Sequence, residues 1–386
     1  MSRVVVAMSG GVDSSVAALL VRDRGEEAVG ITMQLHDRRD PVLSGGEPGA
    51  NRCCGPRDAL DARAAAARLG LPFYVVNLER EFARDVLAPF AAAYREGRTP
   101  VPCADCNRGP KFRHLLERAA ACGAARLATG HYARIDVDPA SGRRRLRRAV
   151  DLRRDQTYFL HDLTQEQLAR VEFPIGGWTK PEVRAAAEAA GLPNAAKPDS
   201  QDLCFVGGGA TYLDIVRRAG GDAGPAGEIV DTGGRRLGRH DGLAAFTIGQ
   251  RRGLGVASAH PLYVVDLDPE SGRVTVGEEG EQYRRDLVAT GMTWVSIAPP
   301  GGPVPATARI RSTHAGAACV AAPLGGGAWQ VRFDEPQRAI TPGQVVVLYD
   351  GDVVLGGGTI ARSAPSGAVF DTLPNAMLES PLGGRA

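Results

Sequence analysis

The stretch Val4-Val5-Val6-Ala7-Met8-Ser9-Gly10-Gly11-Val12-Asp13-Ser14-Ser15 decides the fold of this chain. Its first five residues form an apolar run, which is typical of a buried parallel strand. The apolar run from Val16 to Leu20 predicts a helix directly after the glycines. A strand, a glycine turn and a helix N-terminus together favour anion binding, because glycines let the backbone approach a phosphate and free N–H groups point at it.

The loop belongs to a particular class of phosphate-binding loops. It lacks the Gly-Lys-Ser/Thr ending of a Walker A loop and has instead the pattern Ser-Gly-Gly-x-Asp-Ser over residues 9–14. This pattern is typical of enzymes that adenylate a substrate and release pyrophosphate. The alternative is an ordinary glycine-rich turn, but α/β folds bind ligands at such a strand-to-helix turn, which favours the phosphate site.

Composition predicts a multidomain globular chain. At 386 residues, with 44% hydrophobic and 23% charged residues, the chain is predicted to form two or three domains with ordinary cores. Its formal net charge of +2 neither favours nor excludes a nucleic-acid partner. Nearly all basic residues are arginine, since Lys111, Lys180 and Lys197 are the only lysines. Arginine suits phosphate recognition, but a GC-rich genome produces the same bias and is the favoured explanation.

The sequence predicts a cytoplasmic protein. Its N-terminus enters a strand directly, without a signal peptide, and it has no apolar run near membrane length. Seven cysteines in such a chain do not predict a stable disulfide framework. We therefore expect some of them to be catalytic or metal-bound and the others to be core residues.

Strand and helix patterns alternate over the first part of the chain. The strands are predicted at residues 4–8, 27–33, 73–76 and 126–129. The helices are predicted at residues 58–69, 81–95 and 111–121, with a loop over 99–107. This alternation predicts the α/β class, with a doubly wound parallel sheet of the Rossmann-like, adenine nucleotide alpha hydrolase-like kind and helices on both faces.

The pattern changes after residue 132. A hairpin is predicted over 133–150, helices near 164–171 and 180–190, and from about 208 onward short strands with glycine turns. Strand candidates at 287–289, 306–310, 329–333 and 344–349 predict a small barrel. The predicted domains are a nucleotide-binding catalytic domain over 1–207, a small β-rich domain over 208–284, a C-terminal β-barrel over 285–365 and a disordered tail over 366–386.

Two cysteine loops carry the next chemical signal. Cys103-Ala104-Asp105-Cys106 follows prolines that hold the chain extended. Cys106 is predicted to lie just before a helix, whose N-terminus raises the thiolate fraction. Cys204 lies in a second loop about a hundred residues further on. A zinc site would need a fourth ligand from Cys53 or Cys54 and is the less favoured interpretation.

The other cysteines are assigned to the core. Cys122, on an alanine-rich helix, and Cys319, on a strand, are predicted core residues that need no function. Cys53 and Cys54 follow a long polar loop, and burial is slightly favoured over a place in the site.

Six motifs, taken together and in this order, closely resemble those of bacterial tRNA-specific 2-thiouridylases. The resemblance runs from Val4 to about Ile360, and the cysteine loops with the Gly-Gln-Arg-Arg-Gly-Leu-Gly stretch are its most specific part. The motifs are the phosphate loop, the Cys103/Cys106 loop, Thr129-Gly-His-Tyr-Ala-Arg134, Arg154-Asp-Gln-Thr-Tyr-Phe-Leu160, Asp199–Phe205 and Thr247–Gly255.

The resemblance implies a reaction and its partners. ATP, with Mg²⁺, adenylates the C2 oxygen of the wobble uridine of certain tRNAs, and sulfur from a cysteine persulfide then displaces AMP. Cys106 resembles the catalytic nucleophile, and Cys204 resembles the cysteine that receives the persulfide sulfur, the two then forming a transient disulfide. Asp13 is the catalytic residue expected in the phosphate loop. The expected partners are tRNA and a persulfide donor, either a cysteine desulfurase or a sulfur-relay protein, and the expected state is a monomer.

The same resemblance implies two sets of contact residues. The residues expected to line the ATP site are Ala7, Met8, Ser9, Gly10, Gly11, Val12, Asp13, Ser14, Met33 and Gly130. The residues expected to touch the target base or the rest of the tRNA are Val101, Pro102, Cys103, His131, Arg154, Asp155, Gln156, Arg311 and Gln344. Structural roles without tRNA contact stay open for three places. His131 is then a hydrogen-bonded strand-end residue, and residues 143–148 form a solvated hairpin face. Arg309 and Arg311 then lie on an exposed barrel face.

Two positions depart from the family pattern, and one of them opens an alternative chemistry. Cys103 stands where some relatives have aspartate, and Val101 where relatives often have asparagine. The third cysteine permits a [4Fe-4S] cluster held by Cys103, Cys106 and Cys204, which would replace persulfide chemistry. The persulfide route is favoured, because Cys204 must be free to take sulfur.

Two other functions are weighed against this one. Other adenylating ligases and amidotransferases share the phosphate loop but have no use for paired cysteine loops. A non-enzymatic RNA-binding protein with a relic nucleotide site would not be expected to keep an intact Ser-Gly-Gly-Val-Asp-Ser sequence.

Overall fold

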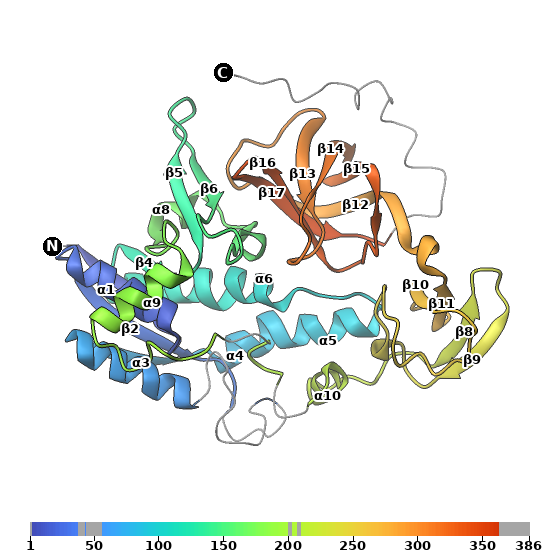
Figure 1. Cartoon of the computed structure of the whole chain (residues 1–386), viewed down its shortest axis with the longest axis horizontal. Coiled ribbons are helices and arrows are strands. Elements are labelled where there is room, and N and C mark those ends of the chain that lie inside the picture. Colours follow the sequence, from blue (N-terminus) through green and yellow to red (C-terminus); the bar gives the residue numbers. More distant parts are fainter. Residues whose placement is uncertain (1, 38–42, 44–55, 200–202, 207–209, 363–386) are drawn as a thin grey trace. The chain divides into compact units, whose positions relative to one another are not determined.

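The computed structural model describes residues 2–37, 43, 56–199, 203–206 and 210–362 (Figure 1). Cys53, Cys54 and the predicted disordered tail therefore lie outside the described residues. The chain divides into two compact units. The first comprises Met1–Pro89, Pro102–Ala219 and Asp352–Val354, and the second comprises Phe90–Val101, Gly220–Gly351 and Leu355–Ala386. The predicted domain boundaries stay a prediction.

The first unit is built on a five-stranded sheet in the order β3-β2-β1-β4-β7. All of its neighbouring strands run parallel, and Val4 of the central strand pairs with Ala28 on one side and Arg126 on the other. The strands are β1 (Arg3–Ala7), β2 (Glu27–Gln34), β3 (Phe73–Asn77), β4 (Arg126–Thr129) and β7 (Val171–Glu172). The predicted α/β parallel sheet is confirmed, and its apolar core strand is fully buried at Val4, Val5 and Val6.

Alanine-rich helices pack against this sheet. One continuous core cluster joins β1 to the helices α1 (Val12–Asp23), α3 (Pro56–Leu69) and α9 (Lys180–Ala189). Small side chains such as Ala17, Ala65 and Ala187 are completely buried there, so the helix backbones lie close to one another. The predicted hairpin is also present, as β5 (Ala133–Val137) and β6 (Arg144–Arg148), and is followed by the 3₁₀ turn η3 (Thr157–Leu160) and α8 (Gln165–Arg170).

The segment that carries Cys103 and Cys106 differs from its prediction. The expected loop over 99–107 is helical from Pro102, because proline has the fixed φ that suits a first helical position. The helical segments are α6 (Pro102–Cys106), the π-helix η2 (Asn107–His114) and α7 (Leu115–Ala121). Cys106 is therefore the last residue of α6 inside a continuous helical stretch, and the prediction that it precedes a helix N-terminus is wrong.

The helix predicted over 81–95 begins two residues earlier and includes a π-helical turn. Its segments are α4 (Glu79–Phe82), η1 (Ala83–Leu87) and α5 (Ala88–Arg95). A further short helix, α10 (Tyr212–Arg218), lies where only strands were expected, and its start is fixed by a capping box between Thr211 and Asp214.

The second unit is mostly β-structure, as predicted. A four-stranded sheet has the order β10-β11-β8-β9, with β8 (Gly227–Asp231), β9 (Arg236–His240), β10 (Tyr263–Asp268) and β11 (Arg273–Gly277). Six further strands close into a barrel, because β12 pairs with both β15 and β17. These strands are β12 (Tyr283–Thr293), β13 (Val304–Arg309), β14 (Ala317–Gly325), β15 (Ala328–Arg338), β16 (Val345–Asp350) and β17 (Val353–Ile360). The sequence predicted a strand at Cys319, which lies on β14, but did not give its bounds, and β17 was not predicted.

In the described part of the chain, no helix is long and apolar enough to cross a membrane.

Candidate active site

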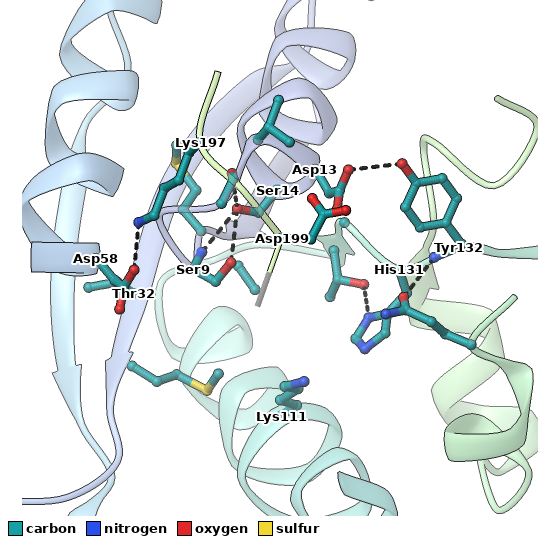
Figure 2. A pocket seen from close by; sticks show the side chains of 18 of the residues that line it. Ser9, Asp13, Ser14, Thr32, Asp58, Lys111, His131, Tyr132, Lys197 and Asp199 are labelled. Atoms are coloured by element: carbon teal, nitrogen blue, oxygen red, sulfur yellow. Dashed lines mark hydrogen bonds and ion pairs between the residues drawn. The ribbon is translucent and has the colours of Figure 1, made fainter. Parts of the chain in front are cut away.

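A cavity of about 250 Å³ opens at the carboxyl ends of β1, β2 and β4 (Figure 2). This edge of a parallel sheet is where α/β folds bind ligands. Nine of the ten residues expected at an ATP site line the cavity. They are Ala7, Met8, Ser9, Gly11, Val12, Asp13, Ser14, Met33 and Gly130. The tenth, Gly10, does not line it.

Gly10 and Gly130 shape the loop from behind. Gly10 has a φ of +79°, and a Cβ there would lie 2.2 Å from the carbonyl oxygen of Asp58. A Cβ on Gly130 would lie 2.6 Å from the backbone nitrogen of Ser14. Both clashes are with backbone, which cannot swing aside as a side chain can. Only glycine at these two positions lets the loop pack between α3 and the end of β4.

Hydroxyl groups and an amide brace the phosphate loop. The Ser14 hydroxyl accepts a hydrogen bond from the Ser9 backbone N–H at 3.1 Å and donates to the Gly11 carbonyl at 3.0 Å. Asn194 is buried and donates to the Gly10 carbonyl and to the Ser15 hydroxyl, at 3.0 and 2.9 Å. Gly11 is the N-cap of α1, and no side chain among the described residues caps this helix. No capping side chain that the structure describes therefore competes with an anion for the first N–H groups of this helix.

Asp13 belongs to a chain of ion pairs. Its carboxylate accepts hydrogen bonds from the Tyr132 hydroxyl at 2.9 Å and from Lys180 Nζ at 2.7 and 2.9 Å. Lys180 is also 2.7 Å from Asp199, which lies 2.8 Å from Arg154. Burial, followed by the charge of Asp13, raises the pKa of Tyr132, so this residue stays a hydroxyl donor.

Asp199 is held in its charged form. Burial by itself would raise the pKa of Asp199, but the hydrogen bond and charge of Lys180, with the charges of Arg154 and Arg184, outweigh it and lower the pKa below the ordinary value. This carboxylate lines the cavity and directly precedes the Cys204 loop.

His131 lines the same cavity as a neutral imidazole. Its Nδ1 lies 2.6 Å from the Thr129 hydroxyl, and its ring packs against Phe112 and Phe173 at centroid distances of 5.7 and 5.8 Å. Desolvation by these surroundings, and then the charge of Lys111, lower the pKa of His131 well below its ordinary value. The hydrogen-bonded strand-end interpretation therefore describes its contacts, and the tRNA contact stays a prediction.

Two of the three residues in the predicted Arg154–Gln156 contact lie at the cavity. Arg154 and Gln156 line it, and Gln156 exchanges two 3.0 Å hydrogen bonds with the backbone of Tyr132. Asp155 is turned inward, with 1% of its side chain exposed, and accepts hydrogen bonds from Arg148 and Thr157. Its carboxylate holds this loop together, and the expected contact of Asp155 with tRNA stays a prediction.

The three candidate sulfur-handling cysteines are not among the residues that line the cavity. Cys103 is exposed, Cys204 is partly exposed and Cys106 is 7% exposed. Near Cys204, the ring of Phe205 packs against Phe82 at a centroid distance of 5.7 Å. Pro102 is buried at the start of α6, and Val101 is partly exposed.

No metal cluster fits the described residues in this arrangement. They contain no group of three or more His, Cys, Asp or Glu side chains placed to hold a metal ion. The set of Cys103, Cys106 and Cys204 therefore does not fit an iron–sulfur cluster here, and no step is derived through one.

The two predicted core cysteines differ. Cys319 on β14 is buried, and this burial raises the pKa of its thiol to about 12, so it is confirmed as a core residue. Cys122 is exposed, and that prediction is wrong. The physical reason is that α7 ends at Ala121, so Cys122 is the C-cap and lies beyond the buried face of the helix.

The remaining predicted contacts lie in the second unit. Arg311 is partly exposed and donates to the Arg338 carbonyl at 3.1 Å, while Gln344 donates to the Thr99 carbonyl at 3.1 Å. Arg309 is only 8% exposed and donates to the His314 carbonyl, so it is not part of an exposed barrel face.

Sequence reasoning missed several residues at the cavity. Lys111, Tyr132, Lys197 and Asp199 line it, and Lys180 contacts it through Asp13. The composition contained a signal that could have identified the lysines, because only three occur in the sequence. Genome bias was the favoured explanation of that scarcity.

Three known protein families match successive parts of this chain. Three families match in order, described as the tRNA methyl transferase HUP domain at residues 2–208, the tRNA methyl transferase PRC-barrel domain at 214–278 and the aminomethyltransferase beta-barrel domain at 284–360. A solved 4-thiouridine synthetase–RNA complex with bound ATP is 18% identical over 56% of this chain and 50% of that one, with a TM-score of 0.33.

Full-length relatives are much closer in sequence. The chain is 48% identical to the tRNA-specific 2-thiouridylase MnmA of Acidobacterium capsulatum and 50% identical to that of Solibacter usitatus, in both cases over 92% of this chain and 98% of the relative. It is 49% identical to that of Geobacter metallireducens over 95% of this chain and 98% of the relative. With about half of its residues identical to theirs over nearly their full lengths, the chain belongs to the tRNA-specific 2-thiouridylase family.

Proposed function

We propose that this chain makes 2-thiouridine at the wobble position of tRNA, using ATP to adenylate the C2 oxygen of uridine and a cysteine persulfide to replace that oxygen with sulfur. The observation that carries this proposal is the phosphate loop at the carboxyl edge of the sheet, whose predicted ATP residues surround one cavity in a chain of this family. The uridine C2 carbonyl is a poor electrophile, and adenylation turns its oxygen into a good leaving group.

The adenylation step needs stabilisation of phosphate charge. We expect the N–H groups at the start of α1 and the hydroxyls of the loop to contact the phosphates and to need little reorganisation as charge develops. Mg²⁺ would accompany ATP and neutralise phosphate charge. The partly exposed Asp13 carboxylate at the cavity is the kind of oxygen ligand that this ion prefers.

The sulfur step needs two thiols. The outer sulfur of a persulfide on Cys204 attacks C2 of the adenylated uridine, and AMP leaves with the former C2 oxygen. The Cys106 thiolate then attacks the inner sulfur, which breaks the persulfide bond, leaves sulfur on the base and forms a Cys106–Cys204 disulfide. An external thiol reductant returns both cysteines to thiols. Cys103 serves as a helper beside Cys106 rather than as a cluster ligand.

The partners follow from this chemistry. The substrate is a tRNA with a modifiable wobble uridine, and the sulfur comes from a cysteine desulfurase or a sulfur-relay protein. These partners place the enzyme in the cytoplasm, where we propose that it acts as a monomer.

The deciding experiment measures both steps. Purified protein is incubated with tRNA, ATP, cysteine and a cysteine desulfurase, and pyrophosphate, which the adenylation step releases, and 2-thiouridine are quantified. We expect Cys204→Ser to release pyrophosphate without forming 2-thiouridine, and Cys319→Ser, the matched buried control, to keep both activities. Mass spectrometry should find the sulfur adduct on Cys204. An adduct found only on Cys122 or Cys319, or pyrophosphate release that does not depend on tRNA, would contradict the proposal.

A further inference from the structure

The three lysines of this chain gather at one place. Of 46 Lys and Arg residues, only Lys111, Lys180 and Lys197 are lysines. Among the described residues, 21 line the cavity at the phosphate loop, and Lys111 and Lys197 are two of them. Lys180 contacts the cavity through its ion pair with Asp13. A chain that uses arginine for nearly every other cation has kept lysine only here, which genome bias does not explain.

Lys197 fixes the backbone of the phosphate loop. Its ammonium group lies 2.6 Å from Asp58 and 2.6 Å from Asp61, and it donates to the Gly10 carbonyl at 3.3 Å. It therefore ties the start of α3 to the glycine turn (Figure 2). Burial would lower the pKa of Lys197, but the hydrogen bonds that it donates to both carboxylates outweigh burial and raise the pKa, so the group stays charged.

Lys180 fixes the acidic residue of the same loop. Its side chain is 8% exposed and its ammonium group contacts both oxygens of Asp13 and one oxygen of Asp199. It thereby joins the phosphate loop to the segment that leads into the Cys204 loop.

Both sites suit an ammonium group and not a guanidinium. Each lysine nitrogen meets three acceptor atoms around one point, which matches the three donors of a compact tetrahedral ammonium. A guanidinium is planar and larger and would spread its donors over a fork, so at buried Lys180 or partly buried Lys197 it would displace Asp13 or Gly10.

Lys111 faces the cavity from the other side. It is partly exposed, lines the cavity from η2 and lies five residues after Cys106 (Figure 2). In the figure its side chain rises from that helical segment toward the phosphate loop. Its positive charge acts within the cavity, because it is one of the causes that lower the pKa of His131.

We propose that the three lysines form an ammonium set for the nucleotide, in which Lys111 touches the ATP phosphates while Lys180 and Lys197 are positioning residues for Asp13 and Gly10. The inference rests on the proposed function only for the identity of the nucleotide. Replacement of lysine by arginine therefore impairs adenylation although the charge is kept.

The first test is chemical labelling of the wild-type chain. An N-hydroxysuccinimide ester reacts with amines, so only the three lysines and the N-terminus are targets. We expect Lys111 to be acylated in the free protein and protected at least tenfold by ATP, while Lys180 and Lys197 stay unlabelled until the protein is unfolded. A Lys111 rate that ATP does not change would overturn its role. This test uses neither tRNA nor a sulfur donor, so its outcome is separate from that of the proposed function.

The second test separates positioning from folding. We expect Lys111→Arg to raise the KM for ATP in AMP formation about tenfold, and Lys180→Arg to lower kcat about tenfold. Arg22→Lys and Arg235→Lys, two exposed arginines paired with neighbouring aspartates, are the matched controls and should change neither. Asp61→Asn does not touch the cavity but removes one partner of Lys197, and a lower kcat with an unchanged melting temperature is expected. Wild-type kcat and KM in all these variants would overturn the proposal.

Discussion

The phosphate loop packs so closely against its neighbours that two of its contacts require glycine. Gly10 and Gly130 place the loop against α3 and the end of β4 with less room than a methyl group needs. The loop is therefore positioned by backbone packing as well as by the hydrogen bonds of Ser14 and Asn194.

Gly130→Ala should weaken ATP binding without unfolding the protein. The new methyl group would meet the Ser14 nitrogen at 2.6 Å and push the start of α1 out of place. Overpacking of this kind costs about 1–3 kcal/mol, and a loss of that size in ATP binding raises the KM for ATP about 5- to 150-fold. The control is Gly177→Ala, because no heavy atom lies within 4 Å of a Cβ at that position. Equal KM values for the two variants would show that the contact at Gly130 does not matter.

Asp105, between the two cysteines of α6, gives the fold a pH dependence. Burial raises the pKa of this carboxyl to about 6, although the charge of Arg108 opposes the rise, and the charge of Asp162 adds to it. In the unfolded chain the same carboxyl ionises near 3.8. Its contribution to stability is therefore full below about pH 4 and is lost as the pH rises through 6.

Asp105→Asn should remove this dependence. The difference in unfolding free energy between the variant and the wild type should change by about 2–3 kcal/mol between pH 4 and pH 7.5, in favour of the variant at the higher pH. Urea unfolding at both pH values measures it. Asp136→Asn is the control, because hydrogen bonds from Arg145 and Arg147 hold the pKa of Asp136 at about 2, outside this range. A constant difference for Asp105→Asn would contradict the raised pKa.

At the scale of elements, the cysteines of the helical segment from α6 to α7 differ in their exposure to solvent. Cys103 and Cys106 are three residues apart on α6, yet the first is exposed and the second is buried. We therefore expect the sulfur step of the proposed function to require more access to Cys106 than this buried position gives.

Alkylation should follow this order. With iodoacetamide at neutral pH, Cys103 and Cys122 should react at least tenfold faster than Cys106 and Cys319, because only exposed thiols meet the reagent. Addition of ATP and tRNA should accelerate Cys106 and leave Cys319 unchanged, since Cys319 belongs to the barrel core. Peptide mass spectrometry over time gives each rate. If Cys106 reacted as fast as Cys103 in the free protein, the buried resting position would be wrong.

The elements that were predicted correctly are those with a clear periodicity. The apolar strands of the first sheet and the alanine-rich helices follow simple patterns, and the phosphate loop follows from its motif. The five-residue α6 was missed because Pro100 and Pro102 suggested an extended chain. The strand β17 was missed because it contains Gly356-Gly357-Gly358, which local propensity assigns to a turn. A Cβ at Gly356 would lie 2.2 Å from the Thr293 carbonyl, so closure of the barrel requires that glycine.

Only part of the candidate site could be predicted from the sequence. Motifs supplied the residues on the loop, but Lys180, which pairs with Asp13 and also with Asp199, comes from a position far along the chain. No local pattern predicts such long-range pairs, and only the folded sheet brings them together.

At the scale of the whole molecule, many arginine side chains form ion pairs with carboxylates of the protein itself. On the hairpin, Arg145 lies 2.8 Å from Asp136, and Arg147 lies 2.7 Å from Asp136 and 2.6 Å from Asp352. These pairs make the hairpin an internal ion network, which agrees with a net charge of only +2. Phosphate contacts with tRNA are therefore expected from arginines that are not held by carboxylates in this way.

Arg311→Ala should test such a contact. Arg311 is partly exposed and lies two residues beyond the end of β13. Its guanidinium donates a hydrogen bond to the Arg338 carbonyl, which is uncharged and does not neutralise the positive charge. Loss of one phosphate contact should weaken tRNA binding and reduce the slope of log K against log salt concentration by about one. Arg145→Ala is the matched control, because its charge is already paired with Asp136 and Asp138 and its slope should equal that of the wild type. Binding titrations from 50 to 200 mM salt, about the range over which such slopes are measured, give both values. A slope for Arg311→Ala equal to that of Arg145→Ala would mean that this residue only supports the turn beside β15.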